Sequence, residues 1–145
     1  GRGGNDLIDT ANGNDIGQGG AGKDMLIGVR GKDRVSGGAA ADRVGGGASA
    51  DRIDGGAGND RLHGGSANAR LAGRSGKDRL TGAKGGDRMV GGSGADRIAA
   101  RDRRRDRIDG GSGRDSASVD RPARAGRKGV ARRRADKVRK VERVR

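Results

Sequence analysis

Asp residues recur every nine residues along most of this chain, and their carboxylates are the groups whose type and spacing could do chemistry. The rhythm runs from Asp6 to Asp60 and resumes from Asp78 to Asp96. Asp can cap a turn without any metal, but capping does not account for twelve Asp residues in one register. Carboxylates stacked in this way repel one another unless a cation lies between them. The spacing therefore indicates sites for a hard cation that prefers oxygen ligands.

The Asp residues belong to thirteen consecutive nonapeptides between Gly1 and Ser118, with Ala69 in one Asp position and a one-residue insertion before Asp106. Most of the nonapeptides begin with one or two Gly, and have a small residue fourth, Asp sixth and an aliphatic residue eighth. A clear copy is the segment 55–63, GGAGNDRLH. This pattern resembles the hemolysin-type, or RTX, calcium-binding repeat GGxGxDxUx. The resemblance covers about four fifths of the chain.

The end of each nonapeptide alternates with a period of two, which predicts a three-residue strand, and the Gly-rich hexamer before it predicts a turn. Two nonapeptides then complete one coil of a parallel β-roll, an all-β two-sheet solenoid. We expect about six and a half coils of eighteen residues in residues 1–118, and an Arg-rich C-terminal cap or tail in residues 119–145. Eighth-position side chains should fill the space between the sheets, and seventh- and ninth-position side chains should face solvent. The expected core comprises Ile8, Leu26, Val35, Val44, Ile53, Leu62, Leu71, Leu80, Met89, Ile98 and Ile108, with Gly17 and Ala117 as gaps.

The resemblance implies that several Ca²⁺ ions lie between neighbouring turns, held by sixth-position carboxylates and turn carbonyls. Because successive turns alternate between the two edges of a roll, the Asp residues should form two rows. The first row is Asp6, Asp24, Asp42, Asp60, Asp78, Asp96 and Asp115, and the second is Asp15, Asp33, Asp51, Asp87 and Asp106, with Ala69 as a gap. The expected carbonyl ligands come from turn glycines such as Gly20, Gly22, Gly38, Gly56, Gly58, Gly76, Gly92, Gly94, Gly111 and Gly113.

Glycine at the first, second and fourth positions allows positive φ and lets successive turns approach closely, so that their carbonyls can point into a common cavity. All four repeats with the full GGxGxD pattern lie in the first row. In the second row, Ala69 removes a carboxylate, Ser49 and Ala67 replace the fourth-position Gly, and the charged segment 101–105 replaces a turn. We therefore expect a nearly continuous row of ions on the first edge and weak binding on the second edge beyond Asp51.

The composition argues against a conventional globular core. The chain has 33 Gly, no aromatic residue and 29% hydrophobic residues, so apolar burial alone is not expected to fold it. Binding of metal to the folded form would supply the missing stability, which predicts a chain that is disordered without calcium. The absence of Cys excludes disulfides and thiolate metal sites, and no apolar run is long enough to span a membrane. Because the chain starts without Met or a signal peptide, we expect it to be part of a larger protein.

Basic residues dominate the surface positions, and the net charge is +14. The seventh position is Arg in nine successive repeats, from Arg34 to Arg107, so each sheet should carry a column of guanidinium groups. This surface either binds polyanions such as cell-surface polysaccharide, lipid headgroups or nucleic acid, or is a solvated surface that protects the flat sheets. The lack of aromatic residues argues against specific recognition of single-stranded nucleic acid.

Two further features concern the tail and catalysis. The segments 136–138 and 142–144 repeat the acid-basic-aliphatic pattern of the strands and favour a capping coil, whereas Val138, Val141 and Val144 also fit one side of a basic helix. The only histidine is His63, and neither a nucleophile elbow nor a P-loop is present, so we expect no enzyme in this chain. Any catalytic activity would belong to an upstream domain.

The sequence thus predicts an extracellular, calcium-binding structural or secretion module of a larger secreted protein. One alternative is an adhesion module that holds anionic cell-surface polymers through its Arg columns. Another, which the resemblance implies, is the C-terminal appendage of a secreted hydrolase or toxin. RTX proteins exported by the type I route usually carry a C-terminal secretion signal, and the Arg-rich end does not resemble one.

Overall fold

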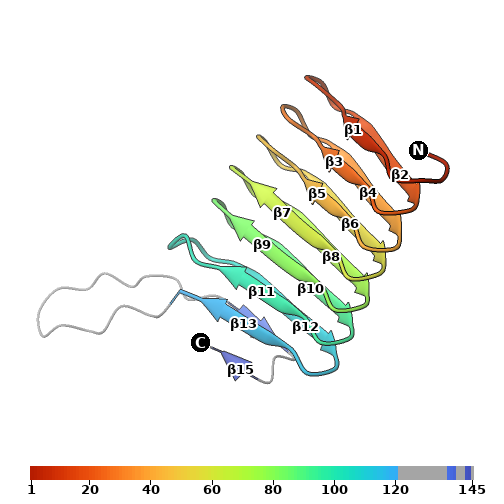
Figure 1. Cartoon of the computed structure of the whole chain (residues 1–145). Helices are drawn as coiled ribbons and strands as arrows, with labels where there is room; N and C mark the ends of the chain where they lie inside the picture. The colour runs from red at the N-terminus through yellow and green to blue at the C-terminus, as the bar shows by residue number, and fades with distance from the viewer. Residues whose placement is uncertain (121–136, 140–142, 145) are drawn as a thin grey trace, which may run out of the picture.

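The computed structural model describes residues 1–120, 137–139 and 143–144, and in these residues the chain forms two parallel β-sheets that face each other in a stack of about six coils (Figure 1). The described residues contain no helix, and hence none long and apolar enough to cross a membrane. The fold is therefore the all-β parallel roll that the repeat predicts.

The strands alternate between the two sheets along the chain. The eight-stranded sheet contains β1 (Leu7–Asp9), β3 (Met25–Ile27), β5 (Arg43–Gly45), β7 (Arg61–Gly65), β9 (Arg79–Ala83), β11 (Arg97–Ala100), β13 (Ser116–Val119) and β15 (Arg143–Val144), in that order. The seven-stranded sheet contains β2 (Ile16–Ala21), β4 (Arg34–Ala39), β6 (Arg52–Ala57), β8 (Arg70–Ser75), β10 (Arg88–Ser93), β12 (Arg107–Ser112) and β14 (Lys137–Arg139).

Strand register repeats from coil to coil, so each repeat position stacks on its own counterpart. Arg52 lies opposite Arg70, and Ile53 lies opposite Leu71. The insertion before Asp106 does not disturb this pattern, because Arg88 still pairs with Arg107 across it. The extra residue is therefore contained in the turn, and the sheet continues in phase.

Strand length differs from the three residues that the alternation predicts. In the seven-stranded sheet the strands from β2 to β12 have six residues each, because they continue through the first two positions of the next repeat, which are both Gly except for Arg74 in β8. Gly20 pairs with Gly38, and Ala21 with Ala39, in the next coil. Glycine lets these backbones approach closely enough to keep the sheet going into the turn.

The core is a single file of eighth-position side chains between the sheets. Ile8 is only partly buried, because the first coil has a neighbour on one side alone. Ala69 and Ala100 also join the core, which the repeat pattern did not predict. The predicted residues that are buried are Leu26, Val35, Val44, Ile53, Leu62, Leu71, Leu80, Met89, Ile98 and Ile108, and Ala117 joins them.

The tail ends in strands where the structure describes it. β14 pairs with β12, and β15 pairs with β13, so the two short strands add a further pair of rungs to the two sheets. This confirms the strand interpretation for 137–139 and 143–144, and excludes a helix there. Pro122 and Gly126 predict a loop at 121–129, and Val130 and Ala131 would extend the helix alternative, but these residues lie outside the described part of the chain.

Candidate metal sites at the turn edges

The turns follow one backbone path that recurs through the stack. Second- and fourth-position glycines have positive φ, for example 104° at Gly20 and 120° at Gly22. The path persists where glycine is replaced, since Val29 and Arg74 occupy the second position with φ of 65° and 79°. The stack therefore imposes the turn conformation even on residues that disfavour it.

First-position glycines do not use the freedom to adopt positive φ, since none of those in the described residues adopts it. Glycine is needed there for space. A methyl group added to Gly55 would lie 2.5 Å from Oδ2 of Asp60 and 2.9 Å from the carbonyl oxygen of Gly73 in the next coil. Both oxygens thus face one small space beside the Gly55 Cα. We call such a space an edge cradle. It is bounded by a first-position Gly, by the Asp of the same repeat and by the first-position Gly one coil later.

The same pairing of an Asp Oδ2 with a carbonyl from the following coil recurs on both edges. It is found beside Gly1, Gly19, Gly28, Gly37, Gly46, Gly55, Gly73 and Gly91. The sequence interpretation did not name these carbonyl oxygens as metal ligands. They belong to Gly19, Gly37, Gly46, Gly55, Gly64, Gly73, Gly91 and Gly110. The signal in the sequence was the recurrence of Gly at the first position of most repeats, because a residue without a side chain lets another backbone approach closely.

The carbonyl groups that were predicted as metal ligands lie elsewhere in the turn. All ten predicted residues are second- or fourth-position glycines. The Cα of each lies against a carbonyl group of the preceding coil. The ten are Gly20, Gly22, Gly38, Gly56, Gly58, Gly76, Gly92, Gly94, Gly111 and Gly113. For example, Gly38 faces the carbonyl oxygen of Gly20, and Gly76 faces that of Gly58. The carbonyl oxygens of six predicted residues therefore face the turn of the following coil; they belong to Gly20, Gly38, Gly58, Gly76, Gly92 and Gly94.

Hydrogen bonds between coils hold each carboxylate in place. The backbone N–H of Asp24 donates to Oδ1 of Asp42 at 2.8 Å, and the N–H of Asp42 donates to Oδ1 of Asp60 at 2.8 Å. On the first edge this ladder is unbroken from Asp6 to Asp115. The structure thus brings the predicted Asp residues into two rows that each advance by one coil.

The second oxygen of these carboxylates has no partner. A buried carboxylate oxygen without a hydrogen bond or a cation is costly, because it has lost its water. Asp106 makes an interaction and is not among these residues. The Oδ2 atoms that are buried without a hydrogen-bond partner belong to Asp6, Asp15, Asp24, Asp33, Asp42, Asp51, Asp60, Asp78, Asp87, Asp96 and Asp115.

Burial also makes these carboxylates hard to ionise. Loss of water raises the pKa of Asp51, Asp60, Asp87 and Asp96 to about 6, although a backbone hydrogen bond partly lowers each value. Neighbouring carboxylates raise it further, as Asp78 and Asp42 do for Asp60. Burial raises the pKa of Asp42 and Asp78 in the same direction. A nearby cation would remove this cost.

The second edge is interrupted at one position. Beside Gly64, the Cβ of Ala69 occupies the place of the carboxylate. Beyond it the ladder resumes, because the N–H of Ala69 donates to Oδ1 of Asp87 at 2.8 Å and the N–H of Asp87 donates to Oδ1 of Asp106 at 2.7 Å. Weak binding on the second edge beyond Asp51 stays a prediction, and Ala69 is the position where the geometry favours it.

Asparagine side chains accept a second set of hydrogen bonds between coils, the Asn ladder, which was not predicted. The backbone N–H of Lys23 donates to Oδ1 of Asn5 at 2.8 Å, and that of Lys77 donates to Oδ1 of Asn59 at 2.7 Å. Asn14 and Asn68 accept equivalent hydrogen bonds. The signal was the position of Asn directly before the sixth residue of four repeats. These amides reinforce the contact between coils without adding charge.

Carboxylates alone do not complete a metal site. The described part of the chain contains no group of three or more His, Cys, Asp or Glu side chains able to hold a metal ion. Any cation must therefore take most of its ligands from the backbone. Ca²⁺ accepts such mixed sets, since it binds six to eight oxygens from carboxylates and carbonyls at about 2.3–2.6 Å.

A parallel β-roll with one buried carboxylate per turn defines a class of repeat protein with candidate metal sites along its edges. The family model of the RTX calcium-binding nonapeptide repeat (4 copies) matches residues 1–26, 18–51, 27–62, 36–71, 63–98 and 103–117. The chain belongs to this family. Neither a curated protein nor a solved structure gives a significant match to the chain.

Proposed function

We propose that this chain binds several Ca²⁺ ions in its edge cradles and folds into the roll when it does so. The observation that carries the proposal is the set of eleven buried Oδ2 atoms without a partner. Eight of the cradles place a carboxylate oxygen and a carbonyl oxygen around one small space. A hard cation is the partner that satisfies both atoms at once.

Each residue of the repeat has a distinct part in binding. The N–H of the Asp one coil earlier fixes Oδ1, which leaves Oδ2 directed into the cradle. The first-position Gly keeps the cradle open, and the positive φ of the second and fourth positions turns the chain between coils. Bound Ca²⁺ would supply the positive charge that offsets the burial of the carboxylates.

Folding should depend on this binding because the apolar core is small. It is one side chain thick, contains no aromatic residue and includes Ala69, Ala100 and Ala117. Gly-rich chains lose much backbone entropy when they fold. A ligand that binds only the folded form adds its binding free energy to the stability of that form. Calcium-dependent folding is the expected consequence.

The proposed setting is extracellular, as a structural or secretion module of a larger secreted protein. Extracellular calcium modules bind with dissociation constants of about 10⁻⁴–10⁻³ M, so a chain of this kind would stay unfolded in the cytosol and fold after export. The absence of Cys is compatible with a fold that calcium, rather than disulfides, stabilises.

We propose no catalytic role for the chain itself. Its only histidine, His63, is exposed on β7, and the activity of any associated hydrolase or toxin domain would reside elsewhere. The sequence upstream of Gly1 tests that alternative directly. The adhesion alternative rests on a separate observation and is argued in the next subsection.

The decisive experiment is a calcium titration of the purified chain followed by far-UV circular dichroism, with magnesium as the control ion. We expect a cooperative gain of β signal with calcium and none at equal magnesium, because Mg²⁺ requires a smaller octahedral site and retains its waters. Calorimetry should show several ions bound per chain. A chain that stays disordered at millimolar calcium, or folds equally well without it, would rule out the proposal.

A further inference from the structure

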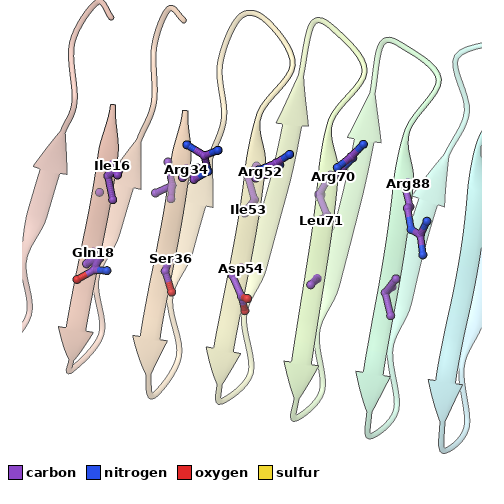
Figure 2. A pocket seen from close by; sticks show the side chains of 14 residues that line it. Ile16, Gln18, Arg34, Ser36, Arg52, Ile53, Asp54, Arg70, Leu71 and Arg88 are labelled. Carbon is purple, nitrogen blue, oxygen red and sulfur yellow. The ribbon is translucent and has the colours of Figure 1, made fainter. Parts of the chain in front are cut away.

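Five arginines form a continuous column on the outer face of the seven-stranded sheet. The register places Arg34, Arg52, Arg70, Arg88 and Arg107 directly opposite one another on β4 to β12. All five side chains are exposed. Figure 2 shows the first four on successive strands at one level of the sheet. The column therefore presents one guanidinium group per coil to solvent.

The charge of this column is not neutralised within the described residues. None of the five arginines makes an ion pair there. Asp54, an acid on the same face, is held instead by Arg74, whose Nη2 lies 2.6 Å from Oδ2 of Asp54. Asp109 accepts a hydrogen bond from the N–H of Gly111. Like charges directly opposite each other destabilise a sheet, so this face is arranged at a cost to the fold.

A shallow groove of about 460 Å³ runs beside the column and crosses five strands, from β2 to β10. Arg34, Arg52, Arg70 and Arg88 line it. The ninth-position side chains that also line it are short or of medium length, namely Gln18, Ser36, Asp54, Ala72 and Val90. Figure 2 shows Ser36 and Asp54 further along the strands of Arg34 and Arg52, and Gln18 further along the strand of Ile16. The groove thus runs along the stack of coils, with the guanidinium groups on one side of it.

The spacing of the cations selects among polyanions. Strands in a sheet are about 4.8 Å apart, so the guanidinium groups should recur at about that interval. Each strand of duplex DNA carries a phosphate every 3.4 Å or so along its axis, which does not match this interval. The chain also has no aromatic residue on which single-stranded bases could stack. A nucleic acid therefore fits this face poorly.

We infer that the outer face of the seven-stranded sheet binds an extended acidic polysaccharide, whose carboxylate or sulfate groups pair with Arg34, Arg52, Arg70, Arg88 and Arg107. Planar guanidinium groups bind such oxyanions through two parallel hydrogen bonds. The sugar backbone would lie in the groove over the short ninth-position side chains. This inference rests on the proposed function, because the column exists only when calcium has folded the roll.

The opposite sheet supplies a matched control. Arg43, Arg61, Arg79 and Arg97 form a shorter column there, with Met25 before it and Ser116 after it. These arginines occupy the same repeat position and are equally exposed. A cavity of about 870 Å³ lies on this sheet, but it covers only the end from β9 to β13; Arg79 and Arg97 line it, whereas Arg43 and Arg61 do not.

The test compares two triple variants with equal charge loss. Arg52→Gln/Arg70→Gln/Arg88→Gln alters the proposed face, and Arg43→Gln/Arg61→Gln/Arg79→Gln alters the control face. The probe is a fluorescent heparin octasaccharide at one fixed calcium concentration. We expect binding roughly tenfold weaker for the first variant, because three exposed charge pairs are lost, and only a slight change for the second. Equal losses in both variants would overturn the inference and leave only non-specific attraction.

Two further measurements make every outcome decisive. Circular dichroism in calcium separates the two proposals: an unfolded wild-type chain refutes the proposed function, whereas a folded wild-type chain that ignores the octasaccharide refutes this inference alone. Stronger binding of a short DNA duplex than of the octasaccharide would also refute it. If the triple variant does not fold, Arg70→Gln alone should still weaken binding relative to Arg61→Gln.

Discussion

The backbone N–H of Asp42 donates a hydrogen bond to Oδ1 of Asp60, 2.8 Å away and one coil further along the stack. This bond uses one oxygen of Asp60 and leaves the other, Oδ2, buried without a partner. The backbone of each coil thus orients the carboxylate of the next coil. Because the contact recurs along both edges, a change at one Asp should affect the sites on either side of it.

Asp60→Asn should raise the calcium concentration at the folding midpoint several-fold. Asn keeps an oxygen that can accept the N–H of Asp42, but it removes the negative charge from the cradle beside Gly55. Circular dichroism during a calcium titration measures the effect. The control is Asp54→Asn, which removes the ion pair with Arg74 and a minor electrostatic effect on Asp60, and should shift the midpoint little. Equal shifts in both variants would contradict a metal-binding role for Asp60.

Ala69→Asp should restore the missing site on the second edge. The N–H of Ala69 already donates to Oδ1 of Asp87, so the backbone ladder is in place. The carbonyl of Gly82 also faces the space beside Gly64, where the new carboxylate would enter. We expect about one more calcium ion per chain in calorimetry and a lower folding midpoint. Ala72→Asp adds the same charge on the outer face and should leave the stoichiometry unchanged.

Gly55→Ala should close an edge cradle from the backbone side. The added methyl group would lie 2.5 Å from Oδ2 of Asp60, so either the carboxylate or the coil must move. We expect weaker calcium binding and a higher folding midpoint. The control Gly45→Ala changes a ninth-position glycine with no atom within 4 Å of the new methyl group. If Gly45→Ala is as harmful as Gly55→Ala, the effect comes from a general need for glycine and not from the cradle.

The metal-free chain should gain β structure as the pH falls. Burial raises the pKa of Asp51, Asp60, Asp87 and Asp96 to about 6 in the roll, above the value of about 3.9 in an unfolded chain. The roll therefore binds more protons than the unfolded chain between these values. Its metal-free stability is greatest below about pH 4 and is lost as the pH rises through about 6.

Circular dichroism in a chelator across this range measures the effect. Protons then take the place of calcium in neutralising the buried carboxylates. In saturating calcium the carboxylates stay ionised, so the same acidification should bring no gain. Loss of β signal on acidification in the chelator would show that these Asp residues are not buried in the metal-free state.

The turn edges also show which structural features the sequence predicted and which it did not. The two Asp rows and most core positions follow from the period, because similar repeats must stack in register. The strands of the tail were favoured by its acid-basic-aliphatic pattern, beside the helix alternative. The six-residue strands and the Asn ladder were missed. Both depend on how closely the backbones of neighbouring coils approach, as at Gly20 and Gly38, and a single repeat does not contain that information.

The sequence by itself determined which residues share an edge or a face, since a period of nine and two repeats per coil place every residue above its counterpart. Only the tertiary structure decided which oxygens meet in a cradle, why Gly55 cannot carry a side chain, and which acids leave the Arg column unpaired. Asp54 pairs with Arg74 and not with Arg52 on its own strand. The carbonyl oxygen of Gly73 faces the same space beside Gly55 as Oδ2 of Asp60. These contacts are set by the distance between coils and by backbone dihedral angles, which arise when the whole stack packs together.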